Sequence, residues 1–248
     1  MICASRGVGL YVASETHRVV WSRATKPGAR LLIYVQGSHG TAETTFNAER
    51  PDLEALARAG FIVALADVSQ TTSQGTFGNT TSQTRIGQLR TFMLGASSPI
   101  VPSSGEMFLV GGSGGAAAIL NYARANPANV AAIAATTPLV DLQDFYTSRT
   151  DATITQAEVN AAYGGDVTAS YATHNPSASG NQTALAGVPM KLYYSTDDPY
   201  IPVSTVTNYE TLVRAVSGTI ERQSLGAVGH TDAGVSYEEV GRWLNAHS

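Results

Sequence analysis

The chain has 248 residues, of which 43% are hydrophobic and 14% are charged, and its formal net charge at pH 7 is −4. A chain of this length and composition can bury a sizeable core as one globular domain. The weakly acidic balance gives no electrostatic reason to expect a nucleic acid or an anionic membrane as a partner.

The single cysteine, Cys3, excludes an internal disulfide and a metal cluster built from cysteines. No window of the sequence reaches the roughly eighteen consecutive apolar residues that a membrane span needs. The first residues show no basic segment followed by a long apolar one, so a secretory signal is not expected. A cytoplasmic location is the default expectation, with a phage-borne or exported protein as the alternative.

Strand and helix patterns alternate along the first part of the chain. Residues 10–13 and 19–22 alternate like two antiparallel strands, which would form the edge of a sheet. Residues 31–35 and 61–66 are apolar runs typical of buried strands. Residues 51–58 lie between these runs, begin with a proline and are closed by a glycine, a pattern that predicts a helix.

The alternation continues through the middle of the chain. A helix is expected at 83–94 and a strand at 107–110. An alanine-rich helix follows and ends at Asn126, and the apolar run 130–135 predicts another strand.

The C-terminal part repeats the pattern, with strands expected at 190–194 and 219–225 and a helix at 236–245. Strands that alternate with helices predict a mostly parallel sheet with helices on both faces. The expected fold class is therefore α/β.

Two long segments, 69–82 and 142–185, do not fit the minimal alternation. The first is rich in Ser, Thr, Gln and Gly, and it follows a strand whose carboxyl end should face the ligand-binding side of the sheet. We expect it to be either a surface loop or a polar wall of a binding site, with Gln70, Phe77 and Asn79 as candidate contacts.

The most informative motif is the run from Gly111 to Gly115, with Ser113 at its centre. An apolar strand precedes it and a helix follows it, which is the layout of a nucleophile elbow. Small neighbours permit the strained backbone that exposes the serine hydroxyl. A dinucleotide turn also fits these residues, but it expects the first βα unit and an acid about twenty residues on. Neither is found here, so a hydrolase nucleophile is favoured, with tight packing as the plain alternative.

A serine nucleophile requires a base and an orienting acid. Asp197 and Asp198 follow the strand expected at 190–194 and precede a new helix. His230 lies in a glycine-containing loop after the strand expected at 219–225. The order serine, aspartate, histidine is that of the α/β-hydrolases.

On these residues the chain resembles the α/β-hydrolase-fold serine hydrolases of the small esterase or lipase type, and the resemblance covers nearly the whole chain. In that family the acid is usually followed shortly by Val or Ile and then Pro, which the run 198–202 matches with Asp198 in register. The resemblance therefore implies Ser113, Asp198 and His230 as a catalytic triad. Asp197 remains the alternative acid.

The resemblance also implies an oxyanion hole. The early strand leads into the loop 36–40, where Gln36 replaces the histidine that is usual in the family. Because the oxyanion donors are backbone N–H groups, this replacement need not remove the function. By position the donors would be the amides of Ser38 and Gly114.

In this family an insertion such as 142–185 is often a cap over the pocket. We therefore expect residues 1–248 to form one domain with a small partial cap, and a surface elaboration without substrate contact is the alternative. Tyr146 in this segment, His39 beside the oxyanion loop and Tyr200 beside the acid are further candidates for substrate contact.

The predicted chemistry is acyl transfer to water, with no metal or organic cofactor. Carboxylic esters are the first choice of substrate by analogy with the fold, whether small molecules or esters borne by a cell envelope or polymer. A peptidase or amidase would use the same triad. The opposing class is a catalytically silent binding module. The sequence does not indicate an oligomeric state.

Overall fold

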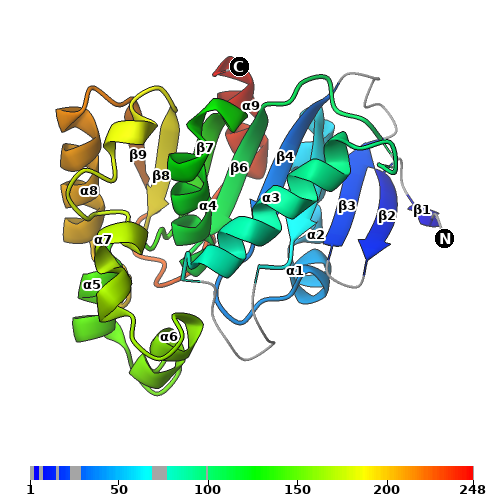
Figure 1. The fold of residues 1–248 in the computed structure, drawn as a ribbon. Helices are drawn as coiled ribbons and strands as arrows, with labels where there is room; N and C mark the ends of the chain where they lie inside the picture. The colour runs from blue at the N-terminus through cyan, green and yellow to red at the C-terminus, as the bar shows by residue number, and fades with distance from the viewer. Residues whose placement is uncertain are drawn as a thin grey trace.

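The computed structural model describes residues 3–5, 8–14, 17–22, 29–68, 77–98 and 100–247. Within these residues nine strands form one sheet, in the order β1-β2-β3-β5-β4-β6-β7-β8-β9 (Figure 1). The strands are β1 (Cys3–Ser5), β2 (Val8–Ser14), β3 (His17–Ser22), β4 (Arg30–Val35), β5 (Phe61–Ala66), β6 (Met107–Gly112), β7 (Val130–Thr136), β8 (Met190–Tyr194) and β9 (Ile220–Ser224).

The sheet has an antiparallel edge and a parallel centre. Strand β2 pairs antiparallel with β1 on one side and with β3 on the other, and β3 pairs antiparallel with β5. From β5 through β4, β6, β7 and β8 to β9, each neighbouring pair is parallel. The predicted edge hairpin and the predicted mostly parallel sheet are both confirmed.

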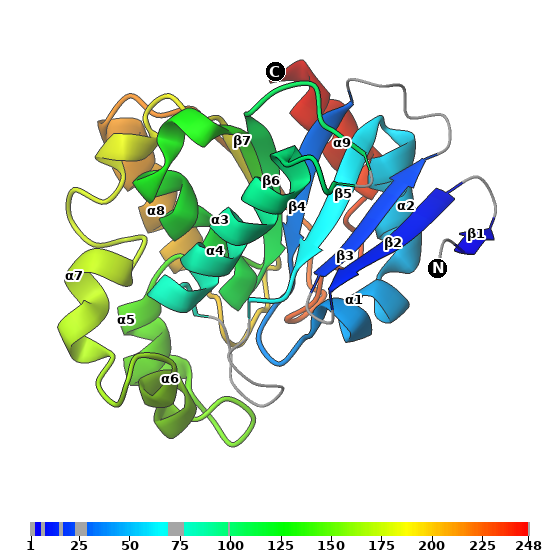
Figure 2. The same ribbon diagram turned by 45° about the vertical axis from the view of Figure 1, so that its right-hand side comes forward.

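Helices cover both faces of the sheet (Figures 1 and 2). On one face lie α1 (Ala42–Ala48), α2 (Arg50–Arg58) and α9 (Tyr237–Ala246). On the other face lie α3 (Thr80–Leu94), α4 (Gly114–Ala125) and α8 (Val203–Ala215). None of the helices in the described part of the chain is both long and apolar enough to span a bilayer.

The central strand β4 shows why two cores form. Its side chains alternate between the faces of the sheet, as in any strand. Leu31 and Ile33 pack into the core beneath α3, α4 and α8, whereas Leu32 and Tyr34 pack into the core beneath α1, α2 and α9. Because both faces are covered, the strand is apolar from Leu31 to Val35 instead of alternating with polar residues.

Two helices depart most from the sequence-based expectation. Helix α3 begins at Thr80, three residues before the predicted start, because the Asn79 side chain accepts a hydrogen bond from the Ser82 amide (2.9 Å) and caps the helix. The end of the predicted polar loop is therefore helical, and residues 69–76 lie outside the described residues. Helix α1, capped by Thr41, was not predicted.

The segment 142–185 forms short helical pieces between β7 and β8, most of which are grouped together beyond one end of the sheet (Figures 1 and 2). Phe145, Val159 and Leu185 anchor it, because all three are buried in the core beneath α3, α4 and α8. The pieces are α5 (Leu142–Asp144), η2 (Phe145–Arg149), α6 (Gln156–Ala162), η3 (Thr168–Ser170), α7 (Tyr171–His174) and η4 (Thr183–Leu185); a further turn, η1 (Pro127–Asn129), precedes β7.

Candidate active site

Ser113 occupies the turn between β6 and α4 in a strained backbone conformation, with φ 50° and ψ −123°. A positive φ is unfavourable for a residue with a side chain and persists only where the surroundings enforce it. Here the Ser113 amide donates to the carbonyl of Thr136 at the end of β7 (3.0 Å), and the Ser113 carbonyl accepts from the Leu139 amide (3.1 Å). The neighbouring strand therefore holds the turn in place.

The glycines around Ser113 allow the turn to pack directly against the end of β4. A Cβ atom at Gly115 would lie 2.3 Å from the Gln36 carbonyl oxygen, a backbone atom that cannot rotate away. A Cβ atom at Gly37 would lie 3.4 Å from the Ser113 Cβ. The loop predicted to hold the oxyanion is thus in contact with the elbow.

His230 lies in the loop between β9 and α9 and meets both of its predicted partners. Its Nε2 is 2.9 Å from the Ser113 Oγ, and its Nδ1 is 2.8 Å from the Asp198 Oδ2. An ionised carboxylate accepts only, so Nδ1 carries the proton and donates to Asp198. Nε2 is then free to accept from the serine hydroxyl.

Asp198 is held rigidly at the end of β8. Its side chain is only 1% exposed, whereas that of His230 is 20% exposed. The second oxygen, Oδ1, accepts from the amides of Tyr200 and Ile201, both at 2.9 Å. Three donors therefore satisfy the carboxylate and fix its direction toward the imidazole.

The neighbouring Asp197, the alternative acid, makes different contacts. Its Oδ1 accepts from the Ser195 hydroxyl and from the Gly229 amide, both at 2.7 Å. These two hydrogen bonds, that of Ser195 first, hold the pKa of the Asp197 carboxyl below its ordinary value. Asp197 thus binds the loop that carries the histidine, while Asp198 binds the imidazole itself.

The backbone amides of Ser38 and Gly114 are available for a ligand. No carbonyl or side chain of the described residues accepts a hydrogen bond from either amide. Gly114 is the first residue of α4, where amides lack partners within the helix. Ser38 lies in the loop after β4 and Gly114 lies at the start of α4, and these two segments meet at Ser113.

A pocket of about 310 Å³ adjoins Ser113 and His230. Two of its side chains, Glu49 and Asp232, are carboxylates, and none of the described lining residues is Lys or Arg. The lining residues are Tyr34, Gly37, Ser38, His39, Glu49, Gly112, Ser113, Thr136, Thr137, Thr153, Ile154, Tyr200, His230 and Asp232.

Of the side chains predicted to touch substrate, His39 and Tyr200 line this pocket. The His39 Nε2 also contacts the Glu158 carboxylate of α6, so the oxyanion loop touches the insertion. The ring of Tyr200 packs against that of His230, with centroids 5.1 Å apart and the planes at 78°. Both residues therefore lie at the pocket beside Ser113.

The other predicted contacts are engaged within the protein. Phe77 is buried, packs against Phe145 (5.9 Å) and accepts a hydrogen bond at its carbonyl from the Tyr163 hydroxyl (2.6 Å). Asn79 caps α3 and donates to the carbonyl of Ala162 (2.7 Å). Neither residue lines the pocket. Both instead make contacts that join the start of α3 to the insertion.

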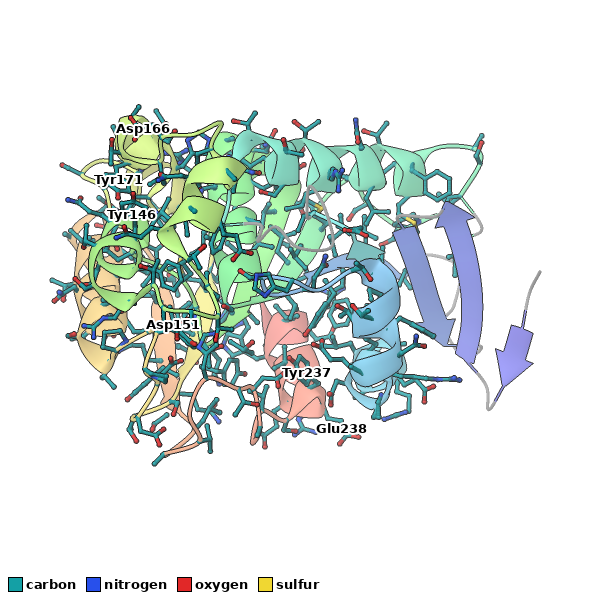
Figure 3. All side chains as sticks on the ribbon, turned by 90° about the horizontal axis from the view of Figure 1, so that it is seen from below. Tyr146, Asp151, Asp166, Tyr171, Tyr237 and Glu238 are labelled. Carbon is teal, nitrogen blue, oxygen red and sulfur yellow. The ribbon has the colours of Figure 1, made fainter. Side chains whose placement is uncertain are left out.

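Tyr146 likewise does not line the pocket, and its hydroxyl accepts a hydrogen bond from the Asn160 side-chain amide (3.0 Å) inside the insertion. Figure 3 shows Tyr146 beside Tyr171 in the insertion, apart from Tyr237 on α9. The remaining predicted contact, Gln70, lies outside the described residues.

A cluster of acids and tyrosines beside the pocket was not anticipated. The Tyr34 and Tyr237 hydroxyls are 3.2 Å apart, and the Tyr237 hydroxyl donates to the Asp232 carboxylate (2.8 Å). Tyr34 also hydrogen-bonds Glu49, yet burial dominates and raises the pKa of Glu49 to about 7. Asp232, two residues after the histidine, was visible as a neighbour in sequence, but nothing in the sequence indicates that Glu49 reaches this pocket.

Among the described residues, no group of three or more His, Cys, Asp and Glu side chains is arranged to hold a metal ion.

No protein-family model and no curated protein sequence matches the chain. Solved structures do match. A thermostable esterase from Pseudomonas putida aligns with a TM-score of 0.72 and 13% identity, over 100% of this chain and 82% of that one. An esterase B from Lactobacillus rhamnosis aligns with a TM-score of 0.74 and 13% identity, over 98% and 88%.

An S-formylglutathione hydrolase from Agrobacterium tumefaciens aligns with a TM-score of 0.61 and 13% identity, over 100% of this chain and 95% of that one. These similarities extend over nearly the whole chain, and they agree with the parallel sheet covered by helices on both faces. The chain has the α/β-hydrolase fold.

Proposed function

We propose that the protein is a serine hydrolase that cleaves carboxylic esters through an acyl-enzyme on Ser113. The observation that carries the proposal is the hydrogen-bonded chain from the Ser113 Oγ through His230 to Asp198, with contacts of 2.9 and 2.8 Å. A hydroxyl at a strained turn beside a base, with the base oriented by an acid, is the arrangement that activates a serine nucleophile.

In the proposed mechanism, Ser113 attacks the ester carbonyl carbon while the His230 Nε2 takes the hydroxyl proton. The negative charge on the carbonyl oxygen is held by the amides of Ser38 and Gly114. Asp198 keeps the imidazole in the required tautomer and stabilises its charged form. The tetrahedral intermediate then collapses, the alcohol leaves with the proton from His230, and the acyl group stays on the serine oxygen.

Water completes the cycle. His230 takes a proton from a water molecule, whose oxygen attacks the acyl carbon. In the second collapse the bond from the acyl carbon to the Ser113 Oγ breaks, His230 gives its proton to that oxygen, and the carboxylic acid is released. Each step uses groups that already lie in contact in the free protein. No reorganisation of the three side chains is therefore needed before attack.

The charges around the pocket favour neutral esters. The Asp232 carboxylate lines the pocket, Glu49 adds a negative charge above its pKa of about 7, and the described lining offers no Lys or Arg to bind a carboxylate or phosphate. Like charges repel most strongly where water is partly excluded. Esters that carry an anionic group near the scissile bond are expected to be poorer substrates than neutral ones.

The test is hydrolysis of p-nitrophenyl esters of increasing acyl length by the wild-type protein and by Ser113→Ala. Loss of the nucleophile should lower kcat by about 10⁴-fold or more. Intact mass after treatment with a fluorophosphonate should show one adduct on the wild-type protein and none on Ser113→Ala.

Other outcomes have distinct meanings. Labelling without ester turnover would favour the amidase or peptidase that the same triad could serve. A folded wild-type protein with neither turnover nor labelling would contradict the serine hydrolase and favour a non-catalytic binding module. Circular dichroism of both proteins serves as the control for folding.

A further inference from the structure

The segment between Asp151 and Ile154 forms one wall of the pocket at Ser113. Thr153 and Ile154, from the insertion, are among its lining residues. Ile154 is 8% exposed, and no other described lining residue has a purely aliphatic side chain. An apolar part of a substrate has most to gain from packing against this side chain.

The wall is a turn whose backbone is organised by one carboxylate. The Asp151 Oδ1 accepts from the amides of Thr153 (2.6 Å) and Ile154 (3.0 Å), and the Asp151 amide donates to the Ile154 carbonyl (3.0 Å). Such a turn is a local unit, since its contacts lie within four residues. Its position relative to Ser113 must come from contacts outside it.

Tyr200 supplies such a contact, and it joins the turn to the proposed triad. Its hydroxyl donates to the Asp151 Oδ2 (2.8 Å), and its backbone amide donates to the Asp198 Oδ1 (2.9 Å). Its ring also packs against the ring of His230. One residue therefore contacts the acid, the histidine and the turn of the insertion.

The charges agree with this geometry. The Ile154 amide, followed by the Tyr200 hydroxyl, holds the pKa of the Asp151 carboxyl below its ordinary value. The same contact with Asp151 raises the pKa of the Tyr200 hydroxyl. Asp151 is thus an ionised acceptor and Tyr200 a neutral donor across the physiological range of pH.

We propose that Tyr200 and Asp151 are positioning residues that hold residues 151–154 at a fixed distance from Ser113, and that Ile154 thereby sets the length of the apolar group that the esterase accepts. The inference rests on the proposed ester hydrolysis and deepens it. In this proposal the insertion forms one wall of the substrate site. The sequence alone leaves open that the insertion is a surface elaboration without substrate contact.

The experiment compares kcat/KM for p-nitrophenyl octanoate and p-nitrophenyl acetate in four variants. Ile154→Ala enlarges the pocket, so the octanoate-to-acetate ratio should rise about tenfold, as expected for methylene groups in an apolar pocket. Tyr200→Phe keeps the ring against His230 but removes the bond to Asp151, so the ratio should rise by about threefold or more because the wall can recede. In the double variant the change in the logarithm of the ratio should be smaller than the sum of the two single changes, since both substitutions act on the same wall of the pocket.

Asp166→Asn is the matched control. Its Oδ1 also organises a turn of the insertion, accepting from the Thr168 amide (2.9 Å), but Asp166 does not line the pocket. Figure 3 shows Asp151 and Asp166 at separate ends of the insertion. The ratio should stay within about twofold of the wild-type value, in line with a surface substitution that leaves the site untouched.

The outcomes separate the two proposals. If the wild-type protein hydrolyses esters but neither Ile154→Ala nor Tyr200→Phe alters the ratio, the proposed role of residues 151–154 is wrong and the proposed ester hydrolysis is retained. The same holds if Asp166→Asn alters the ratio as much as Tyr200→Phe does. If the folded wild-type protein hydrolyses no ester, the proposed function fails and this inference fails with it.

Discussion

Two carboxylates lie beside the same pocket, and they differ in the number of hydrogen-bond donors around them. Asp198, at the end of β8, has three hydrogen-bond donors: the His230 ring and two backbone amides. Glu49, at the junction of α1 and α2, has a hydrogen bond to Tyr34, but no described residue donates to its buried Oε2.

Burial alone therefore does not decide what a carboxylate can do. Desolvation raises the pKa of Glu49 to about 7, and the negative charges of Asp232 and Asp52 add to the effect. The Asp198 side chain is only 1% exposed, and its three donors orient the carboxylate toward His230. We therefore expect Asp198 to act in the chemistry and Glu49 to act on stability.

The largest effect is expected from Asp198→Asn. In this variant the amide oxygen keeps its two backbone donors and the NH2 group faces the Nδ1 of His230. The required tautomer is then disfavoured and no negative charge stabilises the charged imidazole, so kcat for p-nitrophenyl acetate should fall by about 10³- to 10⁴-fold. Steady-state kinetics checks this, with thermal unfolding as the control for folding. A fall of less than tenfold would mean that His230 does not depend on this carboxylate.

A smaller effect, on stability, is expected from Glu49→Gln. The folded pKa of about 7 lies above the ordinary value of 4.5, so between these values the folded protein binds more protons than the unfolded chain. Stability is therefore lost as pH rises through this window, and the loss persists above pH 7.

Glu49→Gln removes this titration. Relative to the wild-type protein, its free energy of unfolding should improve between pH 4.5 and pH 8 by up to about 3 kcal/mol. Urea denaturation at several pH values measures the difference. Parallel pH profiles for the two proteins would show that the Glu49 carboxyl is not perturbed in the folded state.

The smallest effect is expected from Asp197→Asn. Asp197 holds the His230 loop through the Gly229 amide and does not touch the imidazole. Since an amide oxygen can still accept from Gly229, kcat should fall by about tenfold or less, equivalent to about 1.4 kcal/mol. If Asp197→Asn proves as damaging as Asp198→Asn, the division of tasks between the two neighbouring acids is wrong.

Much of the fold could be read from the sequence because its signals are local. The predicted strand at 190–194 coincides with β8, and the apolar runs 31–35 and 61–66 lie in β4 and β5. Apolar runs bounded by turn residues are a property of the chain itself. The start of α3 was missed because its cap, Asn79, lies in a polar stretch that looked like loop.

The candidate site was readable only in part. Ser113, Asp198 and His230 lie in turns and loops that follow strands and have recognisable neighbours in sequence, and the structure brings these three side chains together. Phe77 and Asn79 were predicted at a ligand, yet they join α3 to the insertion. Which way a side chain on an irregular segment points depends on packing partners distant in sequence.

The sequence by itself therefore determined the alternation of most strands and helices, the glycine-flanked turn at Ser113, and the positions of an acid and a histidine in segments that follow strands. Only the tertiary structure decided which of the two adjacent aspartates meets the imidazole. It alone placed Glu49 and Ile154 at the pocket, although these residues lie far from Ser113 along the chain. The physical reason is that strand and turn propensities act over a few residues, whereas a pocket is made by contacts between elements that become neighbours only when the sheet forms.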